Sequence, residues 1–259
     1  MFANYHTHTE RCQHAVGEDR EYIEHAIMGG LKVLGFSDHC PWIYDSNYVS
    51  HTRMLPSQLD EYFNTMSSLK KEYAKDITIY VGFEAEYIPC LMERQNALLK
   101  DYPIDYMILG EHFTDDEQYS KYTGFPSTSE AELSEYVNLI IEGMETGKYL
   151  YVAHPDLFNY VGSEDIYVKH MTRLCEYLKS KSIPIEINLL GVVEHRHYTS
   201  ARFLKIAKAV GNSAIVGVDA HNPERLSNIQ LHKQCEDLAN KFGIPLVKSF
   251  SNLDYVDIK

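Results

Sequence analysis

The segment Ala3-Asn4-Tyr5-His6-Thr7-His8 places a short apolar run directly before two histidines that are separated by one residue. Further short apolar runs follow, and they alternate along the chain with longer stretches that have the period of a helix. This alternation is typical of βα units around a mostly parallel sheet. We count seven such runs, at residues 3–5, 33–37, 77–83, 106–109, 149–153, 183–187 and 214–218. The alternation predicts an α/β fold.

The stretches between the runs have the spacing of helices with one buried face. One such stretch repeats apolar residues on a single helical face, at Leu133, Val137, Ile140, Ile141 and Met144. Ser129 and Glu132 predict the start of this helix, and Gly147 predicts its end. Because no linker or low-complexity segment interrupts the alternation, we expect residues 1–259 to form a single domain.

The composition is that of an ordinary folded protein with an acidic surface. Its 259 residues include 24 Lys+Arg and 37 Asp+Glu, which give a formal net charge of −13, and 44% of them are hydrophobic. Nucleic-acid binding scales with the number of phosphates that basic side chains neutralise, and no basic stripe is visible in the sequence. A nucleic-acid polymer is therefore disfavoured as a partner.

The sequence also indicates where the chain resides. No apolar run approaches the roughly 20 residues that cross a bilayer, and the start lacks a charged region followed by an apolar stretch. The five cysteines include no Cys-x-x-Cys pair, so neither a disulfide framework nor a thiolate zinc site is indicated. We expect a cytoplasmic protein that does not contact a membrane. Its oligomeric state is left open.

Residues that can bind metal ions follow six of the seven runs. They are His6, His8, His14, His39, Glu84, His112, His154, Asp219 and His221. Parallel strands that close into a barrel bring their carboxyl ends to one face, where barrel active sites are built. These nine residues exceed the three protein ligands of a catalytic zinc, so we expect two or three ions at the carboxyl ends of the strands.

The other histidines provide a contrast. A single histidine at a strand end is more often a packing residue than a ligand, and only the joint placement of nine candidates favours ligation. His25, His170 and His232 fall on helical stretches, where we expect solvated side chains. Two connections, residues 40–56 and 113–126, exceed the usual length of α/β loops, which favours lids or binding loops.

Seven segments carry a resemblance to a known family. They are His6-Thr7-His8-Thr9, His14, Ser37-Asp38-His39, Gly82-Phe83-Glu84, Gly110-Glu111-His112-Phe113, Ala153-His154-Pro155 and Asp219-Ala220-His221. In order, and across nearly the whole chain, they resemble the motifs of the PHP (polymerase and histidinol phosphatase) superfamily. Arg53-Met54, Tyr62 and Glu186-Ile187-Asn188 are similar to its branch of stand-alone histidinol-phosphate phosphatases.

The resemblance implies a distorted, TIM-like (β/α)7 barrel with a trinuclear centre of divalent zinc, manganese or iron. On the family pattern one ion is held by His6, His8, Glu84 and Asp219. A second is held by Glu84, His112 and His154, and the third by His14, His39 and His221. Every ligand position of the pattern holds a competent residue here.

The resemblance also implies a metal-dependent phosphomonoesterase. The expected reaction is hydrolysis of L-histidinol phosphate to L-histidinol and phosphate, in histidine biosynthesis, by a hydroxide that bridges two ions. Such a substrate is a small molecule that carries a phosphate, a cationic amine and an imidazole. An acidic pocket would favour the amine, and Glu111 and Glu86 are candidates to form it.

Other residues have candidate roles in the chemistry. Arginine meets two phosphate oxygens at once, and we expect Arg196 to contact the phosphate, with Arg53 as the second choice. The proton for the leaving alkoxide comes from His197 or from a metal-bound water, and the sequence does not separate them. Asp38 is expected either to orient a ligand imidazole or to be structural.

Alternative functions remain open at this point. The first is a PHP-type phosphoesterase that acts on another small phosphate ester or a nucleotide, or a nuclease. A second is a protein that binds metal ions without catalysis, and a third is hydrolysis of a carbon–nitrogen bond. Substrate turnover and metal content are the observations that distinguish them.

Overall fold

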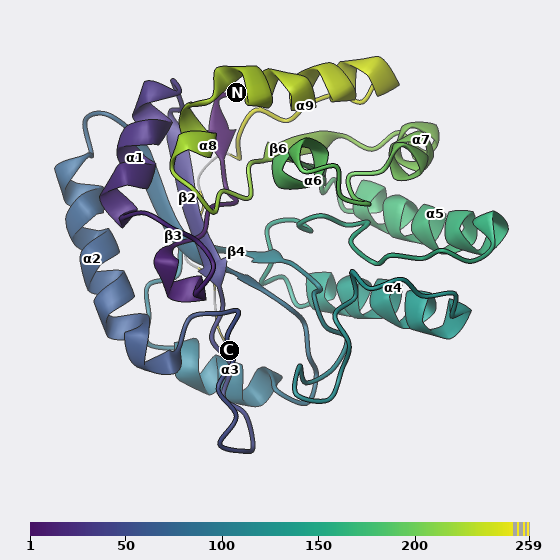
Figure 1. Ribbon diagram of the computed structural model, residues 1–259, viewed down its shortest axis with the longest axis horizontal. Helices are drawn as coiled ribbons and strands as arrows, with labels where there is room; N and C mark the ends of the chain where they lie inside the picture. Colours follow the sequence, from purple (N-terminus) through teal and green to yellow (C-terminus); the bar gives the residue numbers. More distant parts are fainter. Residues whose placement is uncertain (251–252, 254–255, 257, 259) are drawn as a thin grey trace.

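Parallel strands form the centre of the fold (Figure 1). The structure is a computed structural model that describes residues 1–250, 253, 256 and 258. One sheet has the order β1-β2-β3-β4 and a second pairs β5 with β6. Their bounds are β1 Ala3–Asn4, β2 Val33–His39, β3 Thr78–Ala85, β4 Tyr106–Leu109, β5 Ile185–Asn188 and β6 Ala214–Gly217. The predicted α/β fold is confirmed, and its parallel sheet is curled.

Single bridged residues connect the two sheets. Val152 forms parallel bridges with Leu109 on one side and with Ile185 on the other, and Thr7 bridges Ala220. The run at residues 149–153 therefore contributes one bridged residue in place of the expected strand, so the described residues contain six strands. The strand does not continue because His154, two residues after Val152, has a φ of 30°, which turns the chain out of the extended conformation.

Helices cover the outer side of the curled sheet (Figure 1). Their bounds are α1 Asp19–Met28, α2 Leu59–Glu72, α3 Met92–Leu99, α4 Glu130–Glu145, α5 Glu164–Ser180, α6 Leu189–Val193, α7 Ala201–Val210, α8 Glu224–Ser227 and α9 Ile229–Phe242, with short 3-10 turns η1 Glu10–Cys12 and η2 Pro56–Gln58. In Figure 1, α1 and α2 flank the side of the four-stranded sheet, while α5 lies between α4 and α7 on the opposite side.

Helix α4 agrees with the sequence prediction. The Ser129 hydroxyl accepts a hydrogen bond from the Glu132 backbone N–H at 3.3 Å, which caps the first turn. Gly147 lies just beyond the last turn with a φ of 73°, a left-handed conformation that favours glycine. The predicted apolar face packs into the core, with Leu133, Val137, Ile140 and Met144 all buried.

Two helical histidines correct the sequence prediction, because their side chains are buried and not solvated. His170 is 6% exposed, and its Nε2 lies 3.1 Å from a carboxylate oxygen of Glu130. His232 is 1% exposed, and its Nε2 donates to the Arg225 carbonyl at 2.8 Å. Each lies on the buried stripe of its helix, where a hydrogen bond compensates the polar ring. None of the described helices is long and apolar enough to cross a membrane.

Candidate metal centre

The structure brings the nine predicted ligand residues together at the carboxyl ends of the strands. His6 and His8 follow β1, His39 ends β2 and Glu84 lies near the end of β3. The remaining ligand candidates come from the chain segments that follow η1, β4, the Val152 bridge and β6, namely His14, His112, His154, Asp219 and His221. Side chains from residue 6 to residue 221 thus meet around one small volume.

The innermost part of this centre consists of four buried side chains. His8 Nε2 lies 3.1 Å from Asp219 Oδ1, and His6 Nε2 lies 3.5 Å from the same oxygen. His6 Nε2 and His8 Nε2 lie 3.4 and 3.5 Å from Glu84 Oε2. All four residues are at most 4% exposed.

Several polar atoms of this inner group have no hydrogen-bond partner among the described residues. They are Nε2 of His6, both ring nitrogens of His8, both carboxylate oxygens of Glu84 and Oδ1 of Asp219. An unpaired buried polar atom destabilises a fold, typically by about 1–3 kcal/mol. Imidazole nitrogens and carboxylate oxygens that point at one another without partners fit divalent cations, which bind both kinds of atom.

Two further histidines reach Glu84 from the other side. His154 Nε2 lies 2.8 Å from Glu84 Oε1, and His112 Nε2 lies 3.6 Å from the same oxygen. Ligand atoms of His6, Glu84 and His154 lie within 4.8 Å of one another. Glu84 therefore faces imidazoles through both of its oxygens, the arrangement of a carboxylate that can bridge two ions.

The outer part of the centre is more open. Ligand atoms of His14, His39 and His221 lie within 4.8 Å of one another, and His14 is exposed. His14 Nε2 and His221 Nε2 are 3.0 Å apart. This group connects to the inner one through His8, whose ring stacks on that of His221 with centroids 4.0 Å apart.

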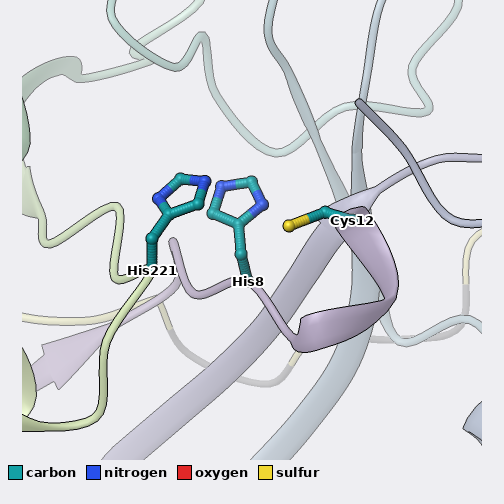
Figure 2. A group of neighbouring side chains, drawn as sticks. All are labelled: His8, Cys12 and His221. Carbon is teal, nitrogen blue, oxygen red and sulfur yellow. The ribbon is translucent and has the colours of Figure 1, made fainter. Parts of the chain in front are cut away.

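Cys12 lies beside these rings, although the sequence indicated no thiolate zinc site. Figure 2 shows His8 next to both His221 and Cys12, and one ligand atom from each of the three lies within 4.8 Å of the others. Cys12 is fully buried, and burial raises the pKa of its thiol above the usual range. A protonated thiol is a poor ligand, so the neighbouring imidazoles are better suited to hold a cation.

Neighbouring groups outweigh the effect of burial on the pKa values of two residues in the centre. Burial favours a neutral Glu84, but the imidazoles of His112, His6 and His39 outweigh it and hold the pKa of that carboxyl well below its usual range. Burial likewise favours a neutral His8, yet Asp219 and Asp38 raise its pKa to about 9.

Two glycines allow buried carboxylates to enter the centre. A Cβ atom on Gly110 would lie 2.1 Å from Glu84 Oε1, and one on Gly217 would lie 1.8 Å from Glu186 Oε1. Real Cβ atoms essentially never show such short contacts, so a larger residue at either position would have to displace the carboxylate.

A cavity of about 510 Å³ opens onto the centre. This volume is typical of small-molecule sites. The cavity is lined by seven of the ligand candidates and by Thr52, Arg53, Glu86, Phe113, Tyr122, Leu190, Glu194, Arg196 and Tyr198. The two long loops, residues 40–56 and 113–126, both contribute to it.

Comparisons with known proteins bear directly on this geometry. Residues 4–189 match the family model described as PHP domain. The chain belongs to the PHP domain family. The matched segment spans β1 to α6 and contains seven of the nine ligand candidates, while Asp219 and His221 follow it.

Individual relatives of this PHP domain are named as phosphatases. The chain is 26% identical over 232 residues to the probable histidinol-phosphatase of Deinococcus radiodurans, in an alignment that covers 84% of this chain and 85% of that protein. It is 31% identical over 114 residues to the histidinol-phosphatase of Bacillus subtilis, in an alignment that covers 42% of each chain.

Solved structures share the fold of this PHP domain. One is histidinol phosphate phosphatase from Lactococcus lactis subsp. lactis, complexed with zinc, L-histidinol and phosphate. It aligns with a TM-score of 0.72 at 21% identity and covers 98% of each chain. A second is the putative histidinol phosphatase of Listeria monocytogenes, with a TM-score of 0.72 at 19% identity over 87% of this chain and 97% of that chain.

Glu186 is a site residue of this PHP domain to which the sequence gave no role. Its Oε1 lies 2.8 Å from His6 Nδ1, while its Oε2 accepts hydrogen bonds from the His154 backbone N–H at 2.7 Å and from Asn188 Nδ2 at 2.9 Å. A carboxylate that accepts from the second nitrogen of a ligand imidazole fixes the orientation of that ring. Its position within β5, the run without ligands, was the available signal.

Asp38 is buried and faces His8, although it directly precedes His39 in the chain. Its Oδ1 lies 3.6 Å from His8 Nδ1 and accepts from the His39 backbone N–H at 2.8 Å, while the Thr9 hydroxyl donates to Oδ2. The carboxylate therefore faces the His8 ring at a distance longer than a hydrogen bond, and its orienting role stays a prediction.

The backbone at two ligand candidates is strained. His154 and Asp219 have φ values of 30° and 53°, in the left-handed region that non-glycine residues rarely adopt. Such conformations cluster at functional sites, where the surrounding structure imposes them. Here the backbone of His154 is held by Glu186, and Asp219 is fixed through a 3.1 Å hydrogen bond from Asn188.

The two arginines expected at the phosphate differ in the hydrogen bonds that they already make. A guanidinium has five N–H groups. Arg53 is 2% exposed and uses all five, since Glu117 and Glu86 each accept two and the Cys40 carbonyl accepts one. Arg53 thus ties the two long loops together, and the structure does not leave it a free donor for a phosphate.

Arg196 retains donors that Arg53 lacks. Its Nε and Nη2 donate to Glu194 at 3.1 and 2.8 Å, and its Nη1 donates to the Tyr198 hydroxyl at 3.0 Å. Three of its five N–H groups are therefore used. Its side chain is 41% exposed and lines the cavity, so the other two can reach a ligand there.

Two residues with an expected role at the substrate, Glu111 and His197, lie outside the cavity lining. Glu111 is fully buried outside the cavity lining, and its Oε2 accepts from the Tyr87 backbone N–H at 3.0 Å, so it is not placed against a substrate. His197 also lies outside that lining, because its Nε2 donates to the Leu157 carbonyl at 2.5 Å. The ring that follows it, Tyr198, lines the cavity instead.

Proposed function

We propose that this chain is a metal-dependent phosphomonoesterase that hydrolyses L-histidinol phosphate to L-histidinol and phosphate. The observation that carries the proposal is the group of buried, unpaired nitrogen and oxygen atoms of His6, His8, Glu84 and Asp219. Glu84 and Asp219 of this group line a cavity of small-molecule size. Family membership and the relatives named histidinol-phosphatase support this substrate. So does the Lactococcus lactis structure with zinc, L-histidinol and phosphate.

The proposal includes the architecture around the site. We propose a distorted (β/α)7 barrel formed by residues 1–259 as one domain. The segment around Val152, between β4 and β5, would complete the set of seven strands. The bridges from Val152 to both sheets, and from Thr7 to Ala220, support a ring that closes in this way. The expected place of action is the cytoplasm.

We further propose that three divalent ions occupy the centre. The first would be held by His6, His8, Glu84 and Asp219. The second would be held by Glu84, His112 and His154, and the third by His14, His39 and His221. The distances support the grouping in part. The ligand atoms of the third set all lie within 4.8 Å of one another, and so do those of His6, His8 and Asp219 in the first set. Zinc, manganese and iron all suit such imidazole and carboxylate ligands.

Bound divalent cations would supply Lewis-acid polarisation of the phosphate and a water activated at neutral pH. The chain itself orients the ligands, through Glu186 at His6 and Asp38 at His8. Glu86 accepts from Arg53 and lies 3.2 Å from His112 Nδ1, which positions a further imidazole.

Arg196 is the side chain that we assign to the phosphate. Its two remaining N–H groups can donate to phosphate oxygens, and its charge opposes the negative charge that the transition state carries on them. Glu194 fixes the guanidinium at the cavity wall. Phe113 and Leu190 give the cavity apolar surface for the organic part of a small ester and limit the access of water.

Phosphate release tests the proposal. Chain loaded with zinc or manganese should hydrolyse L-histidinol phosphate with a kcat/KM at least about tenfold above those for a sugar phosphate and a nucleoside monophosphate, and chelation should abolish the activity. Equal values across the panel would contradict the proposed substrate and favour a general phosphoesterase. Stoichiometric metal binding without phosphate release from any ester would contradict the enzyme itself.

A further inference from the structure

The loop at residues 113–126 carries a tyrosine that the function proposed above does not use. Tyr122 lines the cavity together with Arg196 and Tyr198. Most of the buried tyrosines have partners for their hydroxyl groups; for example, Tyr151 donates to Glu186 at 3.3 Å. The Tyr198 hydroxyl accepts from Arg196. The Tyr122 hydroxyl makes no hydrogen bond with any described residue, so its donor is available to a ligand.

The backbone next to Tyr122 is fixed to the segment that carries a ligand candidate. The Thr123 backbone N–H donates to the His112 carbonyl at 2.9 Å, and its hydroxyl donates to the Glu111 carbonyl at 2.9 Å. The Thr123 carbonyl accepts from the Asn159 backbone N–H at 3.0 Å. Hydrogen bonds on both sides hold this part of the loop in place, as a preformed binding group requires.

Aromatic neighbours fix the ring itself. The Tyr122 ring is nearly parallel to the imidazole of His112, at 14° with centroids 6.3 Å apart. Phe125 meets its edge at 87° and 5.8 Å, and Phe113 lies 6.1 Å away. A phenol ring with few free rotamers loses little entropy when it binds a ligand.

The hydroxyl shares the cavity with charged groups, since Arg196, Glu84 and Asp219 also line it. Burial raises the pKa of Tyr122 to about 12, the Arg196 guanidinium opposes this rise, and the carboxylates of Asp219 and Glu84 add to it. These three groups come from three separate segments of the chain, which meet only at the centre. At neutral pH the hydroxyl keeps its proton and acts as a neutral donor.

We propose that the Tyr122 hydroxyl donates a hydrogen bond to a phosphoryl oxygen of the bound ester, on the open side of the centre and together with Arg196. The inference deepens the proposed function and rests on it for the identity of the ester. The inference is narrower than the proposed function, because it concerns a single hydrogen bond from one neutral donor to a tetrahedral oxyanion. It also gives the loop at residues 113–126 a role in binding.

Substitution Tyr122→Phe removes only the hydroxyl and keeps the ring in its aromatic setting. Hydrogen bonds to charged acceptors contribute about 1.5–3 kcal/mol, so the dissociation constant of inorganic phosphate should rise roughly 10- to 100-fold. Calorimetric titration of the zinc-loaded chain with inorganic phosphate measures it, and elemental analysis should show the wild-type metal content. The matched control is Tyr119→Phe, whose side chain is 82% exposed on the same loop and should bind phosphate as the wild type does.

Three results would overturn the inference: unchanged phosphate affinity in Tyr122→Phe, an equal loss in Tyr119→Phe, or a loss of metal ions from Tyr122→Phe. The two proposals also fail separately. If the wild type hydrolyses the ester and Tyr122→Phe binds phosphate equally well, only the inference fails. If no ester is hydrolysed but phosphate binding depends on Tyr122, the inference stands as a phosphate contact and the proposed function fails.

Discussion

Glu84 and Glu111 are both fully buried carboxyl groups near the ends of neighbouring strands, and their surroundings differ completely. Around Glu84 the nearest nitrogens of His154, His39 and His6 lie at 2.8, 3.2 and 3.4 Å. Around Glu111 one backbone N–H donates to Oε2, and Oε1 has no partner among the described residues.

The pKa values of the two carboxyl groups are therefore shifted in opposite directions. Imidazoles outweigh burial at Glu84 and keep its pKa well below the usual range. At Glu111 burial dominates, the Tyr87 N–H opposes it only in part, and the pKa lies well above the usual range. Burial of a carboxylate therefore does not make a metal site. The site is marked by the imidazoles that converge on it.

Replacement of Glu84 should have the largest effect, because both of its oxygens face ligand imidazoles. We expect Glu84→Ala to lose ions from the purified chain and to lower turnover by more than about 100-fold, the upper range for residues that only support a ligand. Elemental analysis and phosphate release measure both quantities. The matched control, Glu111→Gln, should keep its ions and its turnover. Full activity in Glu84→Ala would refute the bridging role.

Replacement of Glu186 should have an intermediate effect. Glu186→Gln keeps the shape of the side chain but removes the charge that faces His6 Nδ1, so the imidazole becomes a weaker and less well oriented ligand. The affinity for zinc should fall about 10- to 100-fold. Competition with a chromophoric chelator measures this change, with Glu176→Gln on the exposed face of α5 as the control. An unchanged affinity would mean that Glu186 only packs.

Replacement of Glu111 should have the smallest effect, and it should stabilise the fold. Because the folded pKa of Glu111 lies above the unfolded one, its contribution to stability is present below the unfolded pKa and is lost as the pH rises through the folded pKa. Glu111→Gln does not titrate, so its advantage should grow from pH 4 to pH 8. We expect about 1 kcal/mol, or roughly 2–4 °C in the midpoint of thermal unfolding. A variant that is less stable than the wild type at pH 8 would contradict the account.

Periodicity and position made much of this molecule predictable. An apolar run followed by a histidine or an acid places that side chain at a strand end, and parallel strands bring such ends together. The convergence of His6 and Glu84 with His221, 215 residues after His6, could therefore be expected from spacing alone. The limits of α4 followed equally well from Ser129 and its apolar face.

Properties that depend on tertiary partners could not be predicted in this way. Arg53 and Arg196 are the same residue type. Only the structure shows that Glu86, Glu117 and the Cys40 carbonyl accept from all the donors of Arg53. Glu111 directly precedes His112, and consecutive residues of an extended segment point to opposite sides, so the acid turns away from the cavity. Glu186 acts through His6, a contact that spans most of the chain.

The central claim is that side chains scattered from His6 to His221 hold a cluster of cations, and counting those ions tests it most directly. Elemental analysis of the purified chain, saturated with zinc and then freed of unbound metal, should give two to three ions per chain for the wild type. The same measurement on Glu84→Ala should give at least one ion fewer. Less than one ion per wild-type chain would contradict the claim.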